Sequence, residues 1–105
     1  MGQISEDQIR RDLKLIRDFY KYRLEFEKTK AKPNSYFIGK IKTYNKLIKF
    51  APIPLQSIYF NMYIRGDTLE VLADKMCYAY VHLQRLHKRI IDYFYSIMNV
   101  QDFVV

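Results

Sequence analysis

The stretch GDTLEVLADKMCYAYVHLQRLHKRII, residues 66–91, holds two helical patterns separated by a short break. Gly66 tolerates the left-handed conformation that ends a helix, and Asp67 or Thr68 can cap the helix that follows. Two sets of apolar residues then recur at helical spacing: Leu69, Leu72, Ala73 and Met76, followed by Leu83, Leu86 and Ile90. The stretch therefore predicts two helices joined by a tight corner.

The rest of the chain repeats this helical spacing. A stripe of Ile9, Leu13, Ile16, Tyr20 and Leu24 predicts a long N-terminal helix from about Glu6 to Lys30, packed on the chain's own core or in a coiled-coil contact. Further stripes predict helices over about 35–50, 55–64, 69–76 and 79–98, with Pro52 and Pro54 ending the second of the five. No strand pattern is present, so we expect an all-α fold of about five helices.

Length and composition bound the class of protein. The 105 residues suit one domain, with a helical and basic segment over 6–50 and the two-helix pattern within 53–98. Cys77 is the single cysteine, which rules out an intrachain disulfide and fits a reducing cytoplasm. No apolar run approaches the ~20 residues that span a bilayer, so we expect no membrane association.

The net charge of +7 is concentrated in one segment. Residues 28–49 hold seven lysines and no acid, whereas the other 11 basic residues balance the 11 acids. Such a block favours a polyanion such as DNA, RNA or an anionic membrane surface, although it equally suits a solvated helix face. In the predicted second helix, Lys42, Lys46 and Lys49 lie opposite the apolar stripe of Phe37, Ile41, Tyr44 and Ile48, and Lys40 is also in this block.

No pattern of catalysis, cofactor binding or metal binding is present. His82 and His87 are five residues apart, which is not the spacing of two ligands on one helical face, and Cys77 alone cannot complete a zinc site. The tripeptide RGD, Arg65 to Asp67, is interpreted as a helix boundary. We expect no enzyme, no cofactor and no metal.

A helix-turn-helix needs a small residue in its supporting helix and apolar residues that lock the angle to the second helix. Ala73 supplies the small residue. The opposite side of the second helix carries Tyr80, Gln84, Arg85 and Lys88. Arginine and glutamine suit bidentate contacts with guanine and adenine, and lysine suits phosphate.

The same residues resemble the helix-turn-helix of sigma-70 region 4 and of small phage transcription regulators of the ArpU and RinA type. The similarity runs without a gap through Gly66, Thr68, Leu69, Glu70, Ala73, Met76, Leu83 and Arg89. It covers roughly the last 50 residues, whereas the first 50 are alike only in being helical and charged. The resemblance implies that Ala79, Tyr80, Val81, Gln84, Arg85 and Lys88 read bases and backbone.

Three positions depart from the pattern of that family. Cys77 stands at the corner position usually held by glycine, which predicts a strained or altered turn. Ala79 replaces the capping serine, and Val81 replaces an acidic residue that commonly reads cytosine.

The sequence thus favours a transcription regulator, of phage or prophage type, that binds double-stranded DNA through the second helix and adds phosphate contacts from Lys40, Lys42, Lys46 and Lys49. A homodimer or a partnership with RNA polymerase is expected, because one recognition helix rarely gives enough specificity. The alternative is a protein-interaction module that binds RNA polymerase or another regulator without reading DNA. A weaker option is single-strand or RNA binding through the ten tyrosines.

Overall fold

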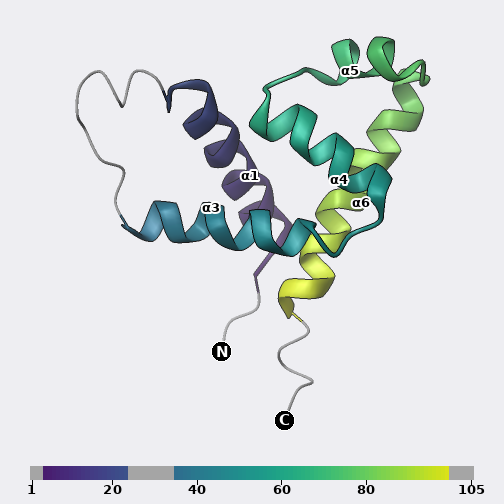
Figure 1. The fold of residues 1–105 in the computed structure, drawn as a ribbon. Coiled ribbons are helices and arrows are strands. Elements are labelled where there is room, and N and C mark those ends of the chain that lie inside the picture. The colour runs from purple at the N-terminus through teal and green to yellow at the C-terminus, as the bar shows by residue number, and fades with distance from the viewer. Residues whose placement is uncertain (1–3, 24–34, 100–105) are drawn as a thin grey trace.

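The computed structural model of the chain describes residues 4–23 and 35–99, and within these ranges every regular element is helical. Figure 1 shows the arrangement. The elements are α1 (Glu6–Lys21), α3 (Ser35–Ile48), α4 (Ile53–Tyr59), the π-helical turn η1 (Phe60–Ile64), α5 (Leu69–Met76) and α6 (Tyr80–Asn99). The predicted all-α class is confirmed for the described residues.

Helix α1 begins where the sequence predicts and ends earlier. The Ser5 side chain accepts a hydrogen bond from the Gln8 amide at 3.1 Å, which caps the first turn. Ile9, Leu13 and Ile16 are fully buried in the protein's own core, so the stripe is not a coiled-coil surface left open for a partner.

The predicted continuation of α1 toward Lys30 is wrong for the described residues, because the helix ends at Lys21. Tyr22 is the C-cap, with φ of -102° and ψ of 12°, and its amide donates to the Asp18 carbonyl. Leu24 and the predicted break around Pro33 lie outside the described residues.

Helix α3 has the two faces that the sequence predicts. Ile41, Tyr44 and Ile48 are buried, whereas Lys42, Lys46 and Lys49 are exposed on the other side. The sequence predicts that this helix ends near residue 50, and in the structure it ends at Ile48.

The third predicted helix begins two residues early and widens in its last turn. Pro52 is the N-cap of α4, and Pro54 lies in the first turn, where a missing amide donor costs little. The chain then widens into η1, and the Arg65 amide donates to the Phe60 carbonyl at 3.0 Å. Gly66 follows with φ of 84°, so the RGD tripeptide is a helix boundary as predicted.

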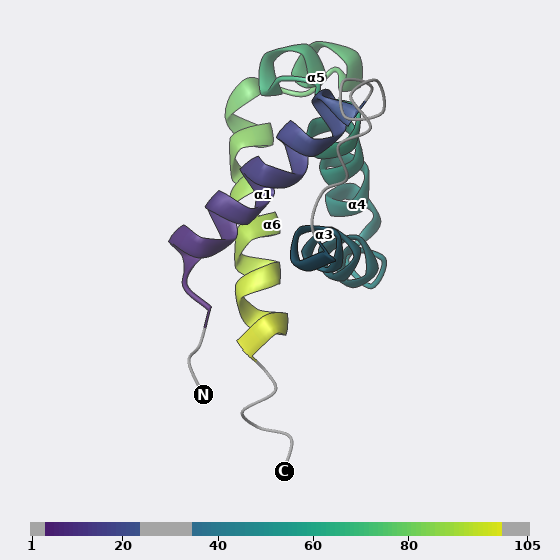
Figure 2. The same cartoon turned by 90° about the vertical axis from the view of Figure 1, so that its left-hand side faces the viewer.

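Helix α6 is the centre of the packing, and Leu83, Ile90 and Phe94 on it are fully buried. Figure 2 shows α1 crossing α6 obliquely, with α4 beside α6 and α5 above its N-terminal end. Helix α3 packs on the C-terminal half of α6, where the Tyr44 and Phe94 rings lie edge to face with their centroids 4.8 Å apart. The two ends of α6 therefore have different neighbours.

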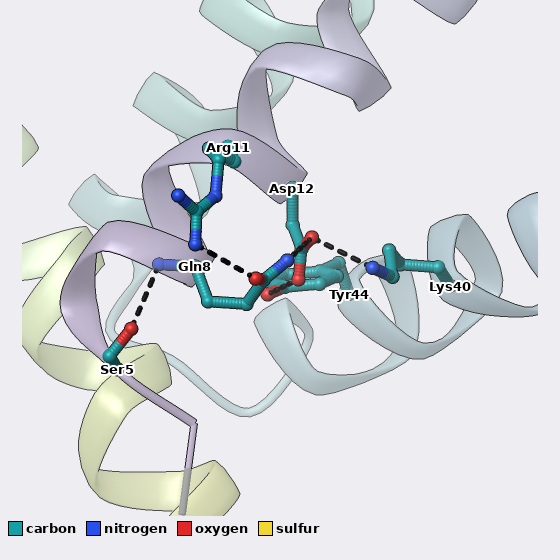
Figure 3. Close-up of polar contacts among 6 residues, drawn as sticks. All are labelled: Ser5, Gln8, Arg11, Asp12, Lys40 and Tyr44. Carbon is teal, nitrogen blue, oxygen red and sulfur yellow. Dashed lines mark hydrogen bonds and ion pairs between the residues drawn. The ribbon is translucent and has the colours of Figure 1, made fainter.

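A buried carboxylate joins α1 to α3 (Figure 3). Asp12 is 1% exposed; its Oδ1 accepts from Gln8 Nε2 at 2.7 Å and from Lys40 Nζ at 2.8 Å, and its Oδ2 accepts from the Tyr44 hydroxyl at 2.7 Å. The hydrogen bond to Asp12 raises the pKa of Lys40, and burial raises that of Tyr44. Lys40 is thus an internal partner, not a free phosphate contact as its place in the lysine block suggested.

Candidate nucleic-acid interface

The corner between α5 and α6 is closed by backbone hydrogen bonds. The Tyr78 amide donates to the Ala73 carbonyl at 3.0 Å, and the Cys77 amide donates to the Asp74 carbonyl at 3.3 Å, which together form a Schellman motif. The motif places Cys77 in the left-handed region, with φ of 56° and ψ of 36°. A residue with a Cβ adopts this conformation at a cost of roughly 1 kcal/mol, so the corner is strained as predicted but regular in shape.

Side chains on both sides fix the angle of this corner. Leu72 and Ala73 of α5 are buried where the helices meet, and the Thr68 side chain caps α5 by accepting from the Val71 amide at 3.2 Å. The Tyr78 ring lies edge to face against His82 in the first turn of α6, with ring centroids 5.0 Å apart. The corner is therefore held from its supporting helix and from its own residues.

The buried residues of α6 determine which side of the helix faces outward. Leu83 and Leu86 are buried, and the opposite side of the helix faces outward. Five of the predicted reading residues are exposed on α6, and the sixth, Ala79, is exposed just before its first residue; the five are Tyr80, Val81, Gln84, Arg85 and Lys88. Five side chains of this side line a shallow surface depression: Val81, Gln84, Arg85, Lys88 and Arg89. The structure thus adds Arg89 to the predicted set.

The cations on this face differ in whether they form ion pairs within the protein. Arg85 and Arg89 make no hydrogen bond or ion pair with any residue that the structure describes. Lys88, in contrast, pairs with Glu6 of α1 at 3.0 Å and with Asp92 at 3.3 Å, and the bond to Glu6 raises the pKa of Lys88. Arg85 is therefore the predicted cation most available to a ligand on this face.

The predicted phosphate contacts of α3 are not brought to the same place. Lys42 and Lys46 belong to α3, which packs near Tyr93 and Phe94, and Lys49 directly follows that helix, whereas the reading residues begin at Ala79. At about 1.5 Å per residue, Val81 and Tyr93 are roughly 18 Å apart along α6. The exposed lysines of α3 thus belong to the opposite end of α6 from the reading face.

A second set of cations, which the sequence interpretation missed, lies beside α6. Arg10, Lys14 and Arg17 of α1 line a groove of about 260 Å³ together with Leu13, Met62, Tyr63, His87 and Ile91, from η1 and α6 as well as α1. The signal was present in the sequence, because each of these cations directly follows a residue of the apolar stripe, Ile9, Leu13 or Ile16.

The wall of this groove opposite α1 holds a pair of neutral rings. The Tyr63 hydroxyl is hydrogen-bonded to Nε2 of His87, and the two rings are stacked with centroids 5.9 Å apart. Burial raises the pKa of Tyr63 to about 12, while burial and the neighbouring Arg10 lower the pKa of His87. Tyr63 and His87 are therefore both neutral near pH 7.

No family model, curated protein or solved structure matches this chain. Among residues 4–23 and 35–99, no helix is long and apolar enough to cross a bilayer. The same part of the chain contains no cluster of three or more His, Cys, Asp or Glu side chains that could hold a metal ion.

Proposed function

We propose that this chain is a regulator of transcription that binds double-stranded DNA through the exposed side of α6. The proposal depends most on one observation: Arg85 is exposed and unpaired among the described residues, on a helix whose rotation is fixed by buried Leu83 and Leu86. Arginine at such a position suits a bidentate contact with guanine, and the neighbouring Gln84 suits adenine.

The shape of this end of the molecule supports the proposal. The major groove is about 12 Å wide and admits an α-helix. Figure 1 shows α5 and the start of α6 at one end of the molecule, away from α3. Helix α1 reaches α6 beside His87 and Lys88, which leaves the first two turns of α6 open on their outer side. A duplex could therefore approach Tyr80, Val81 and Arg85 without displacing another helix.

The resemblance to sigma-70 region 4 and to phage regulators of the ArpU and RinA type is consistent with this proposal. Its motif residues occupy the positions that a helix-turn-helix requires: Thr68 caps α5, Ala73 is buried at the helix crossing, and Leu83 is buried under α6. A regulator with one such helix gains specificity from a second copy or from RNA polymerase, so a homodimer or a polymerase complex on DNA is part of the proposal.

The test is selection of bound duplexes from a random DNA pool, compared between the wild type and Arg85→Ala. We expect a defined motif to be enriched by the wild type and its guanine position to lose about 1–3 kcal/mol of discrimination in the variant. Arg11→Ala is the matched control, because it removes an exposed arginine whose visible partner is the side chain of Gln8 in its own helix. A pool that stays random with the wild type would reject DNA reading.

The alternative, a protein-interaction module, has its own supporting observation. Phe50 is 72% exposed, Ile53 is 77% exposed and Phe60 is 49% exposed, and all three lie between the end of α3 and the first residue of η1, Phe60 included. A contiguous exposed apolar patch is typical of a protein contact site, and these three residues fall within a stretch of 11 residues. If this alternative holds, replacing Phe50 and Ile53 by serine abolishes binding to a polymerase subunit or regulator, while Arg85→Ala leaves it intact.

A further inference from the structure

The groove between α1, η1 and α6 concentrates positive charge without a matching carboxylate. None of its eight lining residues is acidic, and three of them are cations on one helix: Arg10, Lys14 and Arg17. These three recur at intervals of four and three residues, so they form one ridge along α1. Their mutual repulsion is unfavourable in the empty protein, and an anion in the groove would relieve it.

The partners of these cations are few. Arg10 and Lys14 have no hydrogen bond or ion pair to any residue within the described ranges. Within the part of the chain that the structure describes, Arg17 donates to the Gly66 carbonyl alone, at 3.2 Å, so other donors of its guanidinium have no partner there. Two acids of the same helix do have cationic partners, since Glu6 pairs with Lys88 and Asp12 with Lys40.

The other lining residues of the groove are apolar or neutral. Leu13, Met62 and Ile91 contribute hydrocarbon, and the Tyr63–His87 pair contributes two stacked rings. Such a lining lowers the local dielectric constant, which strengthens the attraction between the α1 cations and an anion in the groove. Guanidinium groups bind phosphate oxygens in a bidentate way, and the Lys14 ammonium suits them as a point charge.

The groove adjoins the exposed side of α6 described above. Gln84 and His87 are three residues apart and are therefore neighbours on the surface of the helix. The ion pair between Glu6 and Lys88 places the first turn of α1 at the same level of α6. A polyanion lying along the first turns of α6 would thus continue onto the cation ridge of α1.

We propose that this groove binds a phosphoryl group through Arg10, Lys14 and Arg17, and that in the DNA complex this group is a backbone phosphate next to the base pairs under α6. The site itself stands on the groove and its unpaired cations. Its assignment to the DNA backbone rests on the function proposed above. Phosphate contacts of this kind fix the register of a recognition helix and carry no sequence information.

The first experiment titrates the full chain with inorganic phosphate, at constant ionic strength set by chloride, and follows the NMR signals of Leu13, Met62 and His87. We expect these signals to shift together and saturate. Arg10→Gln/Lys14→Gln is expected to weaken phosphate binding at least about tenfold, because two charge-assisted contacts are lost. The matched control is Lys42→Gln/Lys46→Gln, which removes the same charge from exposed positions on α3 and should leave the titration unchanged.

The second experiment measures duplex affinity against salt concentration for the wild type, the groove variant, the α3 control and Arg85→Ala. Each phosphate contact contributes about 0.9 to the slope of log K against log salt. The groove variant should therefore lower the slope by about 2 while keeping the preferred motif, and Arg85→Ala should lose the motif.

The outcomes separate the two proposals. The phosphoryl site is overturned if the NMR signals of the groove residues do not shift on addition of phosphate, or if they shift equally in the groove variant and the α3 control. An unchanged salt slope in the groove variant, with a motif that Arg85→Ala destroys, overturns the DNA assignment of the groove and keeps the proposed function. Phosphate binding at the groove without any duplex binding overturns the DNA function and establishes a site for a free phosphoryl compound.

Discussion

Charged side chains on α1 differ in whether the protein itself supplies their partners. Asp12 is 1% exposed and accepts hydrogen bonds from three side chains, one of them the cation Lys40. Arg10 and Lys14, two residues away on either side, line a surface groove and pair with no described residue. The difference teaches that position on the helix decides the role of a charge: a buried charge needs partners to be tolerated, whereas an exposed one stays available for a ligand.

The largest effect should follow from removing the buried carboxylate. Asp12→Ala leaves the Tyr44 hydroxyl and the Lys40 ammonium without their acceptor, so we expect the free energy of unfolding to fall by about 3 kcal/mol. Urea denaturation followed by circular dichroism measures this change. Asp12→Asn keeps the size of the side chain and should cost less. A loss below about 1 kcal/mol for Asp12→Ala would mean that the cluster does not hold α1 to α3.

A smaller effect should come from the one imidazole in the groove wall. His87 faces Arg10, Lys14 and Arg17 of α1 and Tyr63 of η1, and burial followed by Arg10 lowers its pKa below the ordinary 6.5. The unfolded chain then binds more protons than the folded one as the pH falls below 6.5. The free energy of unfolding should decrease there by at most about 1.4 kcal/mol per pH unit from this group.

The measurement is urea denaturation at several pH values between 6.5 and 5, where most carboxylates are still ionised. The control is His87→Gln, which should flatten the dependence in this window. His82 is exposed and remains in both proteins, so it does not affect the difference between them. An unchanged slope in His87→Gln would refute the assignment to His87.

The smallest effect on stability should come from the groove cations. Arg10→Gln/Lys14→Gln should change the free energy of unfolding by less than about 0.5 kcal/mol, because neither residue has a described partner to lose. A slight increase is expected if relief of repulsion dominates. The same urea experiment checks this. If the free energy of unfolding falls by nearly as much as in Asp12→Ala, the groove cations are structural and do not differ from Asp12 in their role.

Much of the fold could be predicted from local patterns. The spacing of Leu72, Leu83 and Phe94 identified buried faces, and Thr68 and Gly66 marked helix ends as found. The length of α1 could not be predicted, because its stripe continues to Leu24 while the helix ends at Lys21. Periodicity indicates which side of a helix is apolar, and the reach of the neighbouring helices determines how many turns are buried.

The candidate site could be predicted only in part. The exposure of Gln84 and Arg85 follows from helical spacing once Leu83 and Leu86 are assigned to the core. The pairing of Lys88 with Glu6 joins residues 82 positions apart, and no local pattern contains it. The groove cations were visible as residues beside a stripe, but nothing in the sequence showed that they face η1 and α6.

The sequence by itself determined an all-α chain, the inward side of its helices and the corner before α6, because these depend on spacing, caps and turns within a few residues. Tertiary structure alone decided which charges are matched. Lys40 and Lys14 are both lysines of amphipathic helices, yet one meets Asp12 and the other meets no described partner. Electrostatic pairing acts between side chains a few ångströms apart in space, and only the packing of helices from distant parts of the chain sets those distances.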